Sequence, residues 1–161
     1  MRTVHVETGK PYDIFIERGI IDKCGEYVGK LSTAEKVTVI TDTNIAPHYQ
    51  WRVLNSLEKS GFEVKTHIFR AGEESKNLNT IAEMYNTLVN FRMTRKDIIL
   101  ALGGGVTGDM AGFAAATYLR GIDFIQLPTS LLAQVDSSVG GKTGVDLPQG
   151  KNLVGAFHQP I

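Results

Sequence analysis

The segment that most constrains the fold is a glycine-rich turn, GGGVTG at residues 103–108, between two apolar stretches. The run IILAL at 98–102 predicts a buried strand before the turn, and the small, apolar residues of 110–118 predict a helix after it. Glycines in such a unit let the backbone approach a ligand, and the helix N-terminus offers unpaired N–H groups to phosphate. The turn therefore predicts an α/β domain that binds a phosphate-bearing ligand.

Strand and helix patterns alternate along the rest of the chain. We expect strands at 37–41, 63–69, 98–102 and 124–127, and helices at about 49–60 and 78–89 besides the one after the glycine turn. This order predicts a parallel sheet flanked by helices on both faces. Residues 3–6 and 12–16 predict an N-terminal β-hairpin or pair of edge strands, whereas 137–161 shows little periodicity and is expected to be irregular.

The turn also satisfies the G-x-G-x-x-G pattern of dinucleotide-binding proteins, through Gly103, Gly105 and Gly108. Its context fits only in part, since it follows a late strand, and Asp123, about 20 residues on, precedes a strand instead of ending one. Asp42, at the carboxyl end of an earlier strand, is better placed to accept hydrogen bonds from a ribose. We therefore expect a phosphate-bearing ligand without the standard dinucleotide order. A tight connection with no ligand is the alternative.

A second glycine-rich segment, SSVGGKT at 137–143, ends like a P-loop. Asp136 stands where that motif begins with glycine, and its carboxylate would repel phosphates, which argues against a nucleotide triphosphatase. The region concentrates charged and amide side chains: Asp136, Lys142, Asp146, Lys151 and Asn152. Lysines held in glycine-rich backbone near another phosphate-binding turn favour an anionic-substrate site, and an ordinary solvated loop is the alternative.

Composition argues against several classes of function. The 161 residues carry 17 Lys+Arg and 17 Asp+Glu, so the net charge is zero and there is no basic surplus for nucleic acid. No apolar run approaches the roughly 20 residues of a membrane span, and the N-terminus lacks a signal peptide's apolar core. One cysteine, Cys24, allows no internal disulfide. We therefore expect a cytoplasmic protein with no nucleic-acid or membrane partner.

Together, these segments resemble the 3-dehydroquinate synthase family. The likeness lies in LGGGVTGDMAGF at 102–113, QLPTSLL at 126–132, QVDSSVGGKTG at 134–144 and GKN at 150–152, preceded by DTN at 42–44 and GEESK at 72–76. It covers essentially the whole chain. Residues 134–144 are its most specific part, because related sugar-phosphate cyclases and iron-type alcohol or glycerol dehydrogenases diverge there. Ser130 stands where the family usually has threonine, and it keeps the hydroxyl.

The resemblance implies a Rossmann-like, NAD-binding domain from an enzyme of the shikimate pathway, which leads to chorismate and the aromatic amino acids. Members of that family convert 3-deoxy-D-arabino-heptulosonate 7-phosphate into 3-dehydroquinate and inorganic phosphate, and so are phosphorus–oxygen lyases. Bound NAD⁺ is recycled through transient oxidation, phosphate elimination, re-reduction and intramolecular aldol closure. A divalent metal, zinc or cobalt, polarises a substrate hydroxyl in the full-length enzyme.

The resemblance also assigns roles to residues. The implied cofactor contacts are Asp42, Asn44, Glu73, Lys76, Gly104, Gly105, Val106, Asp109, Thr129, Ser130, Leu132, Lys142 and Lys151. The implied catalytic and substrate-binding residues are Asp136, Lys142, Lys151, Asn152 and Arg120, the last offered to the phosphate of an adjacent subunit in a functional homodimer. Plainer interpretations exist for some of them, such as helix capping by Thr129 or a loop carboxylate at Glu73.

No metal site is expected in residues 1–161. The family's ligands, a glutamate and two histidines, belong to a helical domain downstream, and the histidines here show no ligand spacing: His5, His48, His67 and His158. We therefore predict that residues 1–161 are the NAD-binding domain of a two-domain enzyme, able to fold but not to turn over alone. The alternatives are an NAD-dependent dehydrogenase domain of the glycerol or iron-alcohol type, and a non-catalytic nucleotide-binding domain.

Overall fold

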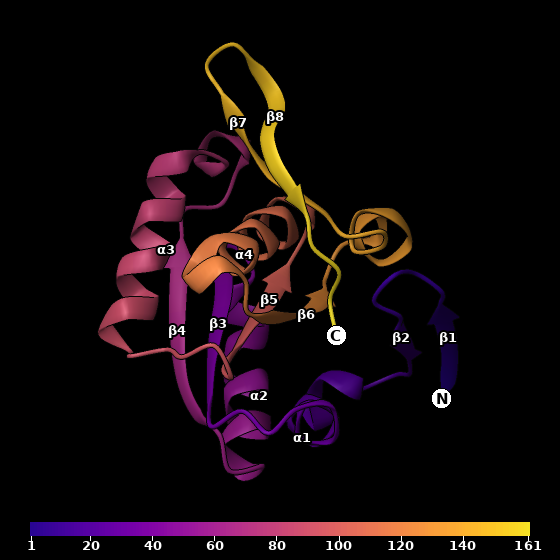
Figure 1. Cartoon of the computed structure of the whole chain (residues 1–161). Helices are drawn as coiled ribbons and strands as arrows, with labels where there is room; N and C mark the ends of the chain where they lie inside the picture. The colour runs from indigo at the N-terminus through magenta and orange to yellow at the C-terminus, as the bar shows by residue number, and fades with distance from the viewer.

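Four parallel strands form the central sheet of this computed structural model, which describes residues 1–161 (Figure 1). β3 (Lys36–Asp42), β4 (Glu63–Phe69), β5 (Ile98–Gly103) and β6 (Asp123–Pro128) lie in the order β4-β3-β5-β6. The two central strands, β3 and β5, are almost wholly buried, as expected of aliphatic runs covered on both faces. All four predicted strands are confirmed, each to within one residue at either end.

Helices cover both faces of the sheet. α1 (Cys24–Leu31) and α2 (Ala46–Lys59) pack on one face, and α3 (Leu78–Asn90) and α4 (Gly105–Thr117) pack on the other. The alternation of side chains along β3 separates the two cores: Val37 and Val39 belong to the first core and Ile40 to the second. The predicted α/β class with a doubly covered parallel sheet is therefore confirmed.

The strand order places β3 beside β5, although β4 lies between them in the sequence. Chain connections leave the sheet in opposite directions from this pair, and such a switch point is where open α/β sheets bind ligands, at the carboxyl ends of the strands. Thr41 is the register partner of Leu102 there, so Asp42 and the glycine turn are next to each other. The fold thus joins two features that are separated by some sixty residues of sequence.

The N-terminal hairpin is also confirmed, with β1 (Arg2–Val6) antiparallel to β2 (Tyr12–Ile16). Short helical turns follow at η1 (Ile20–Lys23), η2 (Glu73–Ser75) and η3 (Tyr118–Arg120). Helix α1 was not among the predicted elements, because it is short and contains two glycines. It forms through packing: Gly25 lies so close to Ser56 O of α2 that no Cβ would fit there.

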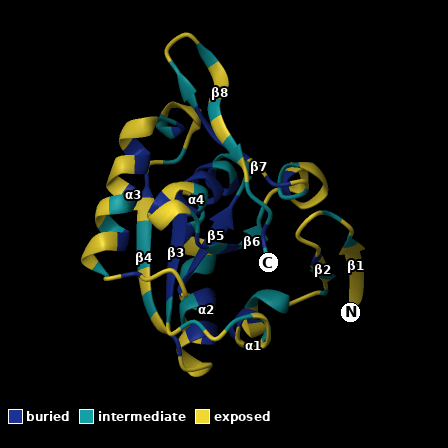
Figure 2. Cartoon of the chain, in the orientation of Figure 1, coloured by how far each residue is buried: buried dark blue, intermediate teal, exposed yellow.

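The prediction of an irregular tail was wrong. Residues Ala133–Ser137 form a π-helical turn, η4, and β7 (Lys142–Leu147) and β8 (Gly150–Phe157) form an antiparallel hairpin. Gly144 and Gly155 face each other across that hairpin, so close that neither position has room for a Cβ. The hairpin rises from the sheet beside α4, and much of its outer surface is exposed (Figure 2). None of the helices in this fold has both the length and the apolarity to cross a membrane.

Candidate functional site

The N-terminus of α4 lies at the carboxyl end of β5, where the glycine turn directs the chain. Gly104 precedes the helix in an extended conformation (φ −82°, ψ −165°), and Gly105, Val106 and Thr107 begin its first turn. The N–H groups of a first turn have no partner within the helix, and no acidic side chain occupies this one. The turn therefore presents backbone donors and the positive end of the helix dipole to an anion.

The segment after β6 lies directly against the glycine turn. The Thr129 N–H donates to Gly103 O at 2.9 Å. A Cβ on Gly104 would lie 3.5 Å from Ser130 Oγ, and a Cβ on Gly105 would lie 3.1 Å from Ser137 Oγ. A Cβ at Gly104 would thus touch Ser130 and one at Gly105 would crowd Ser137, and the lack of side chains at both positions leaves the backbone N–H groups of the turn uncovered.

Asp42 ends the neighbouring strand β3 and is 9% exposed. Its Oδ1 accepts the N–H groups of Asn44 (2.9 Å) and Ile45 (3.1 Å), and its Oδ2 accepts the hydroxyl of Thr107 at 3.2 Å. The carboxylate thus joins the loop before α2 to the first turn of α4. Because a carboxylate accepts about four hydrogen bonds, one acceptor site is left for a hydroxyl of a ligand.

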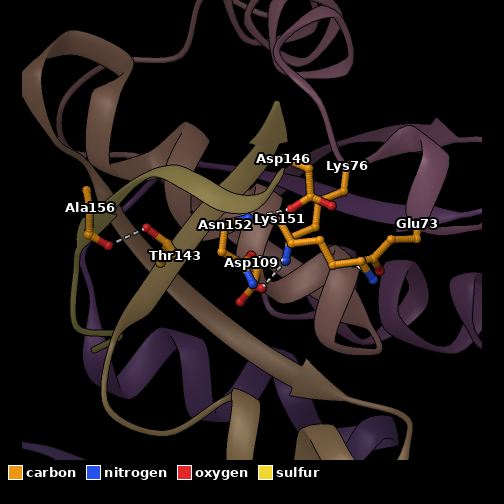
Figure 3. A network of polar contacts seen from close by, with 8 residues as sticks. All are labelled: Glu73, Lys76, Asp109, Thr143, Asp146, Lys151, Asn152 and Ala156. Carbon is orange, nitrogen blue, oxygen red and sulfur yellow. Dashed lines mark hydrogen bonds and ion pairs between the residues drawn. The ribbon is translucent and has the colours of Figure 1, made fainter. Parts of the chain in front are cut away.

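Lys76 connects its own segment, which precedes α3, to α4 and to β8 (Figure 3). Its ammonium donates to Asp109 Oδ2 and to Asn152 Oδ1, each at 2.6 Å. The Lys76 side chain is 5% exposed and that of Asp109 is 22% exposed. Two charge-assisted hydrogen bonds therefore compensate for the water that this ammonium loses on burial, and they fix the distance between α4 and the β7–β8 hairpin.

Alternating charges surround Asp109. Burial raises the pKa of its carboxyl above the ordinary value, the Lys76 ammonium opposes that rise, Glu73 adds to it by repulsion, and Lys142 lowers it by attraction. Lys151 Nζ in turn lies 3.2 Å from Glu73 Oε1, and both of these side chains are exposed. Five residues from three regions of the sequence (73–76, 109 and 142–151) therefore form one electrostatic cluster beside the glycine turn.

Other predicted residues lie outside this cluster. Asn44 is exposed after β3, and Leu132 and Asp136 are exposed on the segment around η4. Arg120 follows the last turn of α4, so about 20 Å of helix separates it from the glycine turn. Within one chain, the structure therefore brings the glycine turn, Asp42 and the lysine cluster together and leaves Arg120 apart.

Three contributors to the site were given no individual role by the sequence, although Asp146 was counted among the charged residues of its region. Thr107 donates to Asp42, Ser137 lies against Gly105, and Asp146 accepts the N–H of Asn152 at 2.7 Å. Only Thr107 had a usable signal, since a hydroxyl in the glycine turn is a natural partner for a carboxylate at the next strand's end. The positions of Ser137 and Asp146 depend on the π-helical turn and the hairpin, which the sequence pattern did not predict.

The residues present do not fit a divalent metal. No three His, Cys, Asp or Glu side chains are grouped so that they could hold one. His5 contacts Asp13 (2.8 Å) and Glu7 (3.1 Å) on the exposed N-terminal hairpin, and His158 contacts Ile122 O at 2.8 Å. The partners of both histidines lie outside the charged cluster, and neither histidine joins it.

Residues 66–161 match the family model of the 3-dehydroquinate synthase N-terminal domain. Over 161 residues the chain is 52% identical to the 3-dehydroquinate synthase of Clostridium acetobutylicum. The aligned region covers 99% of this chain and 45% of that protein. A structure of 2-deoxy-scyllo-inosose synthase, complexed with carbaglucose-6-phosphate, NAD⁺ and Co²⁺, superposes with a TM-score of 0.92 at 28% identity, over 99% of this chain and 43% of that one.

A glycerol dehydrogenase from Schizosaccharomyces pombe also matches, with a TM-score of 0.68 at 20% identity, over 88% of this chain and 33% of that one. At that identity the match shows a common fold alone. The chain spans less than half of the curated relatives that it matches, from 41% to 46% of their length. The comparisons therefore concern one part of those proteins, the part that contains the glycine turn and the hairpin.

Proposed function

The chain belongs to the 3-dehydroquinate synthase family, and we propose that it is the NAD⁺-binding half of a 3-dehydroquinate synthase. The observation that carries this proposal is the position of the Lys76–Asp109–Asn152 network beside the N-terminus of α4. A phosphate-binding turn and a cluster of cations at one switch point suit a dinucleotide on one side and an anionic sugar on the other.

On the cofactor side, the N–H groups of Gly104, Gly105 and Val106 would hold the pyrophosphate, and the free acceptor site of Asp42 would take a ribose hydroxyl. Asp109 and Lys76 would lie at the nicotinamide end. NAD⁺ supplies a reversible hydride acceptor there. Asn44, Glu73, Thr129, Ser130 and Leu132 remain proposed contacts around this path.

On the substrate side, Lys142, Lys151 and Asn152 are proposed to hold the anionic groups and hydroxyls of the heptulosonate phosphate, together with Asp136. Both lysines are exposed, Lys142 at the base of the β7–β8 hairpin and Lys151 near its tip. Lys142 attracts the Asp109 carboxylate, and Lys151 pairs with Glu73 beside it. Lysine suits this task because its ammonium can turn toward either a carboxylate or a phosphate. Residues 1–161 contain no group of side chains that could bind the divalent metal that the family uses.

The reaction that we propose for the whole enzyme is phosphate elimination and carbocycle closure in aromatic amino acid biosynthesis. Arg120, exposed and far from the glycine turn of its own chain, is proposed to reach the substrate phosphate of a second subunit in a homodimer. A net dehydrogenase of the glycerol type is the competing function. It would accumulate NADH with a simple alcohol, whereas the proposed enzyme releases phosphate and returns its cofactor to NAD⁺.

A calorimetric titration of this 161-residue chain with NAD⁺, with ATP·Mg as the control, tests the cofactor half. We expect NAD⁺ to bind and ATP·Mg not to bind. In the full-length enzyme, Lys142→Ala should lower phosphate release at least about tenfold, because it removes a charge that faces the reacting anion. Lys59→Ala, at the exposed end of α2, is the matched control. Binding of ATP·Mg in place of NAD⁺, or full cyclase activity in Lys142→Ala, would contradict the proposal.

A further inference from the structure

Asp146 occupies the middle of the network that holds the β7–β8 hairpin to the rest of the site (Figure 3). Its backbone N–H donates to Lys76 O at 2.8 Å, which ties β7 to the segment before α3. Its Oδ1 accepts the backbone N–H of Asn152 at 2.7 Å. Asp146 is therefore hydrogen-bonded both to Lys76, whose ammonium is buried, and to Asn152, whose side chain accepts a hydrogen bond from that ammonium.

Asn152 has a backbone conformation that needs such support. Its φ of 55° lies in the left-handed region, which asparagine tolerates better than most residues but which still costs energy. The hairpin register shifts at this point, since Val145 pairs with Val154 whereas Leu147 pairs with Gly150. In such a bulge, extra residues on one strand lose their ladder partners, and a side chain can take their place. The Asp146 carboxylate is that side chain here.

The three residues close a ring of hydrogen bonds. Lys76 O accepts from Asp146 N–H, Asp146 Oδ1 accepts from Asn152 N–H, and Asn152 Oδ1 accepts from Lys76 Nζ at 2.6 Å. Each member comes from a different place in the chain: the segment before α3, strand β7 and strand β8. If the Asp146 bond is lost, the bulge has no remaining bond to Asn152 N–H, and the Asn152 side chain is free to leave Lys76.

We propose that Asp146 is a positioning residue, which holds Asn152 in its left-handed conformation so that the Asn152 amide side chain meets Lys76 and faces the substrate. The inference rests on the proposed function for its catalytic consequence, but its structural part stands on the ring alone. The conformation of Asn152 depends on the position of one acceptor oxygen of Asp146 and not on the charge of its carboxylate. Two conservative changes separate these properties: Asp146→Asn keeps the oxygen and loses the charge, whereas Asp146→Glu keeps the charge and moves the oxygen outward by one methylene.

Amide hydrogen exchange, measured by nuclear magnetic resonance on the 161-residue chain, tests the structural part. In Asp146→Asn the Asn152 amide should exchange at nearly the wild-type rate. In Asp146→Glu it should exchange about tenfold faster or more, which is the effect of losing one hydrogen bond. The amides of the Val145–Val154 pair serve as the internal control, since they should keep their protection in both variants.

Equal Asn152 exchange in wild type and Asp146→Glu would overturn the proposal. So would the reverse order, with Asp146→Asn the faster, because charge would then matter more than position. Loss of protection across the whole hairpin in Asp146→Glu would also overturn it, since the role of Asp146 would then be general stability.

The catalytic consequence is tested in the full-length enzyme. Asp146→Glu should raise the KM for the heptulosonate phosphate several-fold with a smaller effect on kcat, and Asp146→Asn should not. A KM that is unchanged in both variants would overturn the catalytic part. Failure of the wild-type chain to bind NAD⁺ while the exchange pattern holds would reject the proposed function and leave the ring intact, so the two failures can be told apart.

Discussion

The glycine turn and the β7–β8 hairpin provide the two sides of the site by different physical means. The glycine turn is attached to a sheet whose central strands are buried, and α4 behind it is buried along most of its length. The hairpin stands out from the body, and exposed apolar side chains lie along it, among them Leu153 (58% exposed) and Phe157 (84%). Packing therefore fixes the first side and the base of the hairpin, where Val145 is part of the core, whereas polar contacts hold the outer part of the hairpin.

This contrast teaches where the site is rigid and where it depends on single bonds. Backbone donors at the N-terminus of α4 cannot move without unpacking the core, because the helix is hydrophobic all round and covered by β6 and β7. The hairpin side depends on the Lys76 ammonium and on the bonds of Asp146. We therefore expect substitutions in the packed side to change stability most, and substitutions in the hairpin side to change geometry and binding.

Gly112→Ala should have the largest effect, because it acts where the hairpin meets the packed side. A Cβ there would overlap Thr143 Cγ2 and lie 3.1 Å from Phe124 Cε2. Thr143 cannot easily turn away, since its hydroxyl donates to Ala156 O at 2.7 Å. We expect a loss of about 2–3 kcal/mol in the free energy of unfolding, measured in urea.

Gly29→Ala is the matched control for that change. Gly29 is also a helical glycine, but nothing lies within 4 Å of its Cβ position, so alanine should stabilise by about 0.5–1 kcal/mol. Equal effects at the two glycines would mean that the contact between α4 and β7 does not hold the hairpin.

Lys76→Met should have the next largest effect, since it removes the cation that joins the two sides. The Asp109 carboxylate and the Asn152 amide would each lose a hydrogen bond in a half-buried place, and we expect a loss of about 2 kcal/mol in the free energy of unfolding. Lys151→Met is the control, because the Lys151–Glu73 pair is exposed (72% and 44%) and should contribute little. Similar losses in both variants would show that burial gives Lys76 no special importance.

A comparison of Asn152→Ala with Asn152→Gly examines the hairpin side alone. Both changes remove the side chain, but only glycine adopts a φ of 55° without strain, so the alanine variant should be less stable by about 1 kcal/mol. At Leu153, an exposed neighbour that does not have a positive φ, the order should reverse, with alanine the more stable of the two. The same order at both positions would contradict the strain at Asn152.

The pH dependence of Asp109 should give the smallest effect. Its pKa is raised in the folded protein from 3.8, so the folded state holds this proton more tightly than the unfolded state does. The corresponding stability is present below the ordinary pKa and is lost as pH rises through the raised value. As pH increases over that range, the unfolding free energy of the wild type should therefore fall relative to that of Asp109→Asn. A stability difference between the two proteins that stays constant over this pH range would contradict the raised pKa of Asp109.

Much of the packed side could be predicted from local patterns. The strand at 98–102, the glycine turn and the helix at 78–89 each have a periodicity or composition that determines their structure with little help from distant residues. Helix α1 and the β7–β8 hairpin do not. Gly25 in α1 and Gly144 in β7 each lie against the backbone of another segment, where a side chain would not fit. The periodicity of a single segment contains no information about such a contact.

The sequence by itself determined the α/β class, the phosphate-binding turn and the residues that resemble those of a known family. These follow from side-chain period, from the backbone freedom of glycine and from the identity of a few polar residues. Only the tertiary structure decided that Lys76 bonds both Asp109 and Asn152, and that Asp146 supports Asn152. Those contacts join segments up to 76 residues apart, so they exist only after the sheet order and the hairpin have brought the segments together.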